Sequence, residues 1–240
     1  MKNLTIEKIL EQEKQMVVSA EEKYGDFFKN AAQANILLMN FVKEIKSSNH
    51  YIFAAFLSSL VKYHTLALFS AVRLHRVQTK SNLRYCLESL TDAAYALQNP
   101  IQEDFLVENN GLLEMPENLR KKRYNWIEKK YKTKSDQTKA IKKDISEWFS
   151  HSSLLFATNH LNMENPHKFG FNFFDSSDDK DDKFVKIDLW QITDIATGAM
   201  GLIFEVNQNC EIITFSEGFI ERLNSITLKN LKLKSTLEVD

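Results

Sequence analysis

The chain has 240 residues, of which 43% are hydrophobic and 26% charged, and its six glycines and three prolines are few for an all-β protein. The net charge of −1 is unevenly spread, because residues 120–143 hold eleven Lys or Arg against two acidic residues, a local charge of +9. Cys86 and Cys210 lie far apart and outside any CxxC or Cys/His cluster, which excludes a disulfide framework or zinc site of that kind. We expect a mainly α-helical bundle with two buried free thiols.

Helical periodicity dominates the first third of the chain. A first helix begins near the N-terminus, and a second is predicted over residues 26–46, where apolar residues recur every three or four positions. The most apolar stretch spans residues 51–72. We expect this stretch to be the central buried helix of the bundle.

The same stretch bears on localisation. It contains Lys62 and His64, which would be costly at the centre of a bilayer. The N-terminal segment lacks the apolar core and cleavage site of a secretory signal. We therefore expect a cytoplasmic protein without a membrane partner.

The helical pattern continues through the middle of the chain. A basic turn at residues 73–80 precedes a helix from about residue 81 to 97. Residues 101–116 are acidic and predict a loop with at most a short helix. Two further helices are predicted over residues 117–131 and 136–159.

The period of the pattern changes near residues 168–189. Apolar residues alternate there with other residues on both sides of a long acidic loop, at Phe169, Phe171 and Phe173 and then at Val185, Ile187 and Leu189. Such alternation is typical of β-strands. We predict one small β-hairpin insertion in an otherwise helical bundle.

Two helices are predicted after the hairpin, over about residues 189–209 and 216–233. Gly198 and Gly201 lie on nearly one face of the first, where close helix packing would benefit from missing side chains. Because no linker or repeat divides the chain, we take residues 1–240 as a single helical domain.

A polar ridge lies on the predicted helix of residues 81–97. Arg84, Glu88 and Asp92 follow one another at four-residue spacing, which places their side chains on one face of a helix. The Arg84/Glu88 pair fits an active-site element, and it equally fits an ordinary ion pair on a helix surface.

A second polar stripe contains the best single candidate for proton transfer. Glu147 and His151 share one helix face, so the carboxylate could fix the tautomer of the imidazole. A histidine that only bridges two helices is the alternative. The same residues, together with His160 and Glu164, also suggest a carboxylate and histidine metal centre as a third hypothesis, although the spacing departs from that of di-iron bundles. We expect no metal or other cofactor.

The basic segment mixes cations with aromatic rings. Cations could contact phosphates and rings could stack on bases, which is what RNA binding requires. The alternative is a helix whose aromatic residues face the core while its lysines face water. The candidate nucleic-acid-binding residues are Arg120, Lys121, Lys122, Arg123, Tyr124, Lys129 and Lys130.

The order of these features resembles a bacterial helical family distantly similar to HEPN domains, over about residues 50–210. The resemblance is carried by a long apolar helix, then Arg84-Tyr-Cys-Leu-Glu88, a basic stretch, and Ile145-Ser-Glu-Trp-Phe-Ser-His151. HEPN proteins are helical bundles, often dimeric, and many are RNases of toxin–antitoxin or phage-defence systems. The resemblance therefore implies a homodimer that acts on RNA.

The HEPN nuclease motif, an Arg followed four to six residues later by His, is absent, because Arg73 and His75 are too close. The resemblance then implies a repurposed pocket of Arg84, Glu88 and His151, or a relative that only binds. Our leading hypothesis is a HEPN-like protein that binds or cleaves RNA in bacterial stress or phage defence. The alternative is a non-enzymatic module that docks a protein partner.

Overall fold

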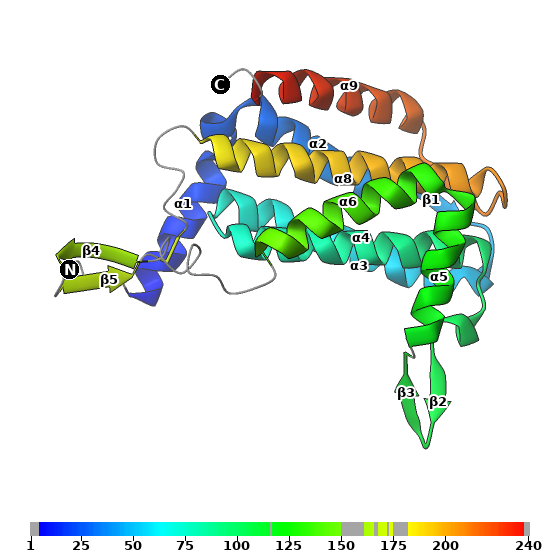
Figure 1. Cartoon of the computed structure of the whole chain (residues 1–240). Helices are drawn as coiled ribbons and strands as arrows, with labels where there is room; N and C mark the ends of the chain where they lie inside the picture. Colours follow the sequence, from blue (N-terminus) through cyan, green and yellow to red (C-terminus); the bar gives the residue numbers. More distant parts are fainter. Residues whose placement is uncertain are drawn as a thin grey trace.

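Figure 1 shows the computed structural model, a molecule built mainly of α-helices. The structure describes residues 5–115, 117–149, 161–165, 168–171, 173–174 and 182–237, with side chains except at 147–149 and 161–171. The helices are α1 (Ile6–Tyr24), α2 (Asp26–Asn40), α3 (Tyr51–Val72), α4 (Arg76–Gln98), α5 (Glu117–Lys130), α6 (Lys132–Phe149), α8 (Lys183–Asn207) and α9 (Phe219–Leu237). The strands are β1 (Val42–Ile45), β2 (Val107–Asn109), β3 (Leu112–Glu114), β4 (Leu161–Asn165), β5 (Lys168–Phe171) and β6 (Ile213–Phe215), and the short 3-10 helices are η1 (Ser48–His50) and η2 (Gln102–Asp104).

The mainly α-helical class is confirmed, and α8 is the helix at the centre. It contacts α2, α3, α4 and α9, and in Figure 1 it runs between the α3–α4 pair and α9. The sequence predicts this central place for α3, but the face of α3 that bears Tyr51, Leu66 and Phe69 is exposed. That prediction is wrong because one face of α3 is open to solvent, while the rest of the helix packs mainly on α4 and less extensively on α1, α2 and α8.

By length and composition alone, the segment Ser48–Val72 is apolar enough to cross a membrane. One third of its most apolar window is buried inside the molecule. Core helices of soluble proteins share this composition.

His64 joins α3 to its neighbours inside the core. Its ring is fully buried, with Nδ1 accepting a hydrogen bond from Asn35 Nδ2 at 2.7 Å and Nε2 donating to the backbone oxygen of Ile192 at 3.0 Å. Burial lowers the pKa of His64 to about 4, although the bond to Ile192 acts in the opposite direction. The imidazole is therefore neutral at pH 7 and ties α2, α3 and α8 together.

The second helix ends earlier than predicted. Helix α2 stops at Asn40, and the next residues form β1, which pairs antiparallel with β6. The rings of Phe41, Phe215 and Phe219 stack on one another at this point, with centroids 4.9 to 6.1 Å apart. A partner strand more than 160 residues away ends the helix, so local periodicity could not reveal it.

Helices α4 and α6 begin earlier than predicted. Helix α4 starts at Arg76, so most of the expected basic turn is helical. Helix α6 starts at Lys132, where the sequence predicts a break. The backbone NH of Ser135 donates to the backbone oxygen of Tyr131 at 2.9 Å. Helical hydrogen bonding therefore spans the predicted break, and only Tyr131 separates α5 from α6.

A small β-hairpin lies at residues 161–171, so only its strand β5 falls within the predicted region of residues 168–189. Strand β5 pairs with β4, which precedes it, in the register Asn162↔Gly170 and Met163↔Phe169. The residues predicted as the second strand instead form the first turns of α8. Val185 and Leu189 are buried there at four-residue spacing, a helical period that overlaps with alternation over so few residues.

Gly198 and Gly201 do not serve close helix packing. A Cβ atom added at either position would meet no other atom within 4 Å. The predicted packing role is therefore wrong, because these glycines border empty space.

Candidate nucleic-acid interface

The predicted ridge on α4 meets the basic helices α5 and α6. Glu88 Oε1 lies 3.5 Å from Arg84 Nε, 3.4 Å from Arg120 Nη2 and 3.2 Å from Lys142 Nζ. Arg84 also donates from Nη1 to Ser146 Oγ at 3.1 Å, so the ridge on α4 contacts α6 one residue before Glu147 of the second predicted stripe. We call Arg84, Glu88, Arg120 and Lys142 the Glu88 cluster.

The Glu88 cluster holds three cations around one carboxylate. Burial alone would raise the pKa of Glu88, but Lys142, Arg120 and Arg84 outweigh it and hold the pKa below its ordinary value. A carboxylate that is held ionised is a weak general base. The cluster is therefore better suited to holding an anion beside its cations than to moving a proton.

Arg123 lies three residues from Arg120 but has a different environment. Its side chain is 5% exposed, and it donates from Nε to Asp92 Oδ1 at 2.7 Å and from Nη1 to the backbone oxygen of Asp104 at 2.9 Å. Its guanidinium also stacks on the ring of Phe105 at 4.9 Å. Arg123 therefore anchors α5 to α4 from inside and offers no cation to the surface.

Lys122 and the aromatic residues also contact the protein itself. Lys122 Nζ and the hydroxyl of Tyr95 both bond the carboxylate of Asp104. Trp126 packs edge-on against Tyr95 at 5.3 Å, and the hydroxyl of Tyr124 accepts from Lys142 at 2.9 Å. Both rings are half-buried, as the alternative of inward-facing aromatic residues predicts.

Several other cations of the basic segment face solvent. Arg120 is about half exposed, and Lys121 and Lys132 are about 70% exposed, each lysine in a weak i,i+4 pair with its own helix. Lys129 and Lys130 are exposed as well, and Lys130 donates to the neutral Gln98 Oε1 at 3.3 Å. These lysines and Arg120 form a positive surface along α5 and the start of α6.

Part of the sequence's charge asymmetry is neutralised within the fold. At least seven of the eleven cations pair with carboxylates, and these carboxylates belong to Glu88, Asp92, Asp104, Glu117, Glu128 and Asp136. The eleven cations of residues 120–143 still outnumber these six carboxylates.

Two predicted site residues fall outside what the structure describes. His151 is among the residues without a described position, and the side chain of Glu147 is not described. Whether Arg84, Glu88 and His151 converge stays a prediction.

The proposed metal centre cannot be built from the side chains that are described. Among them, no group of three or more His, Cys, Asp or Glu is placed to hold a metal ion, and the pairs Glu147/His151 and His160/Glu164 lie outside that part. The thiols of Cys86 and Cys210 are free, with Cys86 buried and Cys210 partly so. Burial raises the pKa of both thiols, which makes them poor nucleophiles.

A second polar cluster was not predicted from the sequence. Glu13 of α1 accepts from His75 Nε2 at 2.6 Å and from Arg73 Nη1 at 3.2 Å. The ring of His75 lies 5.2 Å from that of Phe173 and 5.8 Å from that of Phe174. Because Glu13 and His75 are 62 positions apart, no local spacing could reveal the cluster.

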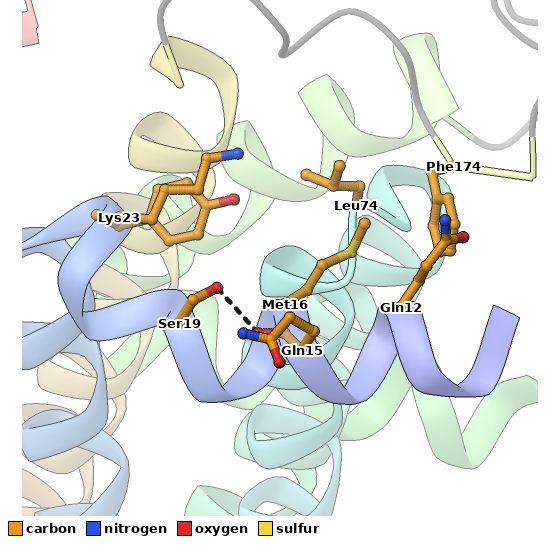
Figure 2. A pocket seen from close by; sticks show the side chains of 8 residues that line it. Gln12, Gln15, Met16, Ser19, Lys23, Leu74 and Phe174 are labelled. Carbon is orange, nitrogen blue, oxygen red and sulfur yellow. Dashed lines mark hydrogen bonds between the residues drawn. The ribbon is translucent and has the colours of Figure 1, made fainter. Parts of the chain in front are cut away.

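A pocket of about 300 Å³ lies beside this second cluster. Figure 2 shows Gln12 and Met16 of α1 facing Leu74 and Phe174 across it. Neither Glu13 nor His75 lines the pocket. Their contacts instead hold α1 against the turn between α3 and α4.

Comparisons with protein-family models, with curated proteins and with solved structures found no match to this chain.

Proposed function

We propose that the protein binds RNA through the positive surface of α5 and α6, with the Glu88 cluster as one phosphate position. The observation that supports this proposal is the surplus of exposed cations beside a cluster where Arg84, Arg120 and Lys142 share one carboxylate. Phosphate contacts by Arg and Lys supply most of the affinity in sequence-independent nucleic-acid binding.

The contacts favour RNA bound through its phosphate backbone. The half-buried rings of Tyr124 and Trp126 contact other parts of the protein, so affinity would come from charge with little contribution from stacking. Such binding depends strongly on salt and weakly on base sequence.

We propose binding without assigning cleavage. Glu88 is held ionised by its three cations, and the neighbouring carboxylate of Asp92 is bonded to Arg123. The resemblance to HEPN domains supports a role in bacterial stress or phage defence, with the chain acting as a homodimer. The polar residues Lys62 and His64 in the most apolar helix support a cytoplasmic location.

The test is the affinity for a fluorescently labelled 20-mer of oligouridine, measured by anisotropy over a salt series. The variant replaces Lys129, Lys130 and Lys132 with Glu. Among the described residues, the only carboxylate paired with these lysines is that of Asp136, one turn from Lys132 in the same helix. We expect at least about tenfold weaker binding. The slope of log affinity against log salt should become shallower by about 0.7 for each phosphate that the variant no longer neutralises.

The matched control reverses three exposed lysines on other surfaces, Lys14, Lys43 and Lys232. It has the same net charge as the first variant, so a general charge effect would weaken both equally. Equal affinity of the two variants, or wild-type binding that does not change with salt, would contradict the proposal.

A further inference from the structure

A cavity of about 540 Å³ lies between α4, α6, α8 and α9. Its apolar wall is formed mainly by Leu87 and Leu90 of α4 and by Ile195 and Leu202 of α8. All four residues are buried, so they form the floor of the cavity. A volume of this size and an apolar lining are typical of sites for small organic molecules.

Two glycines make room for this cavity. Gly198 and Gly201 both line it, and a Cβ at either position would meet nothing within 4 Å. Glycine in a helix interior is unfavourable compared with alanine. Since neither glycine is needed for a positive φ or a close helix contact, the observed effect of both is to leave space over the α8 backbone.

One carboxylate lines the cavity without a bonded partner. Asp194 of α8 forms no hydrogen bond or ion pair through its carboxylate with any residue that the structure describes; only its backbone oxygen accepts, from Thr197 at 3.1 Å. Burial raises the pKa of Asp194, and Lys234 and Lys134 offset this only in part. A cation that reached the carboxylate directly would compensate its lost hydration more completely.

We propose that this cavity binds a small organic amine whose apolar body lies over Gly198 and Gly201 and whose ammonium group pairs with Asp194. The apolar wall would take the body of the ligand, and the carboxylate of Asp194 selects the charge of its head group. Lys134, also at the cavity, disfavours a ligand with a second positive charge. The proposal is independent of RNA binding, because no residue that lines this cavity belongs to the Glu88 cluster or to the positive surface of α5 and α6.

The test uses the fluorescent probe 2-(1-naphthyl)ethylamine and its uncharged analogue 2-(1-naphthyl)ethanol. The two molecules have nearly the same shape, so their difference in affinity reports the charge alone. We expect the amine to bind the intact chain at least about tenfold more tightly than the alcohol at pH 7, as a partly buried ion pair permits. The measurement is a fluorescence titration checked by calorimetry.

Two variants separate the cavity from the charge. Asp194→Asn keeps the shape, so it should lower the affinity for the amine to that for the alcohol. Gly198→Leu fills the cavity, so it should abolish binding of both probes. Leucine favours a helix more than glycine does, and the space at this position is open, so a thermal melt should show a fold at least as stable as the wild type.

The control Ser58→Leu adds the same side chain at an exposed position of α3 and should leave both affinities unchanged. The proposal is overturned by equal binding of amine and alcohol, by Asp194→Asn that keeps the preference, or by Gly198→Leu that still binds both probes. The absence of binding to the wild type at millimolar probe would overturn it as well.

Discussion

Helix α4 contributes to two groups of oppositely charged side chains that differ in their exposure to solvent. Near its start, Lys80 pairs with Asp188 of α8, and the two side chains are 6% and 3% exposed. Two turns later, Glu88 and Arg84 are 27% and 40% exposed, and Arg120 of α5 is 54% exposed. The first group is closed to solvent, whereas the second remains open to a ligand.

The difference shows which charges hold the fold and which are available for binding. Removing one partner from a buried pair leaves an uncompensated charge and costs about 3–5 kcal/mol. An exposed pair contributes about 0–1 kcal/mol, so its loss hardly affects folding. Open charges contribute little to stability, and a surplus of them on one surface is better explained by a partner of opposite charge.

The largest expected effect is at the buried pair. Asp188→Asn removes the charge that faces Lys80 and Arg76, and we expect it to lower the free energy of unfolding by about 3–5 kcal/mol. The measurement is urea denaturation followed by circular dichroism. Glu88→Gln is the control, with an expected decrease of about 1 kcal/mol or less. Equal decreases in the free energy of unfolding of the two variants would contradict the distinction between the buried and the exposed ionic group.

A sharper comparison lies within α5, between two arginines three residues apart. Arg123→Met breaks the buried bonds to Asp92 and Asp104, and we expect it to destabilise the protein by about 3 kcal/mol in the same urea denaturation. Arg120→Met removes a half-exposed cation and should cost less than about 1 kcal/mol. If Arg120→Met were the more destabilising variant, our assignment of the two arginines would be reversed.

His64 extends the comparison to a buried group that stays neutral. Its pKa falls from 6.5 to about 4 on folding, so between these values the unfolded chain binds the extra proton and stability falls as the pH falls. From pH 7 to pH 5 this group should remove about 2 kcal/mol. His64→Gln keeps the capacity to hydrogen-bond but cannot titrate. Between pH 7 and pH 5 the free energy of unfolding of this variant should therefore fall by about 2 kcal/mol less than that of the wild type. An identical pH dependence of unfolding in both proteins would show that His64 has no such role.

Much of the fold could be predicted because helical periodicity is a local property. The apolar spacing of residues 51–72 predicts α3, and four-residue spacing predicts the ridge of Arg84, Glu88 and Asp92 that the structure places beside α5. The end of α2 could not be predicted, since strand β6 lies far along the chain.

The direction of individual charges was harder to predict. A run of cations in the sequence predicts where positive charge is abundant, but it does not predict which of the side chains are buried. A signal was nevertheless present at Arg123, since it lies four residues before the buried Ile127 and shares its face of α5. No comparable signal exists for the bond between Glu13 and His75, which only the tertiary fold brings together.

Glu88→Gln is expected to change stability little, and this variant gives the most direct test of the central claim. Removing the negative charge leaves Arg84, Arg120 and Lys142 less neutralised, so the variant should bind oligouridine more tightly than the wild type. Each added phosphate contact should steepen the slope of log affinity against log salt by about 0.7. Between roughly 200 and 50 mM salt, this steeper slope increases the gain in affinity by about threefold. Tighter binding with a steeper slope is the predicted result, and unchanged or weaker binding with the same slope would contradict the claim that the open cations of α4, α5 and α6 bind RNA.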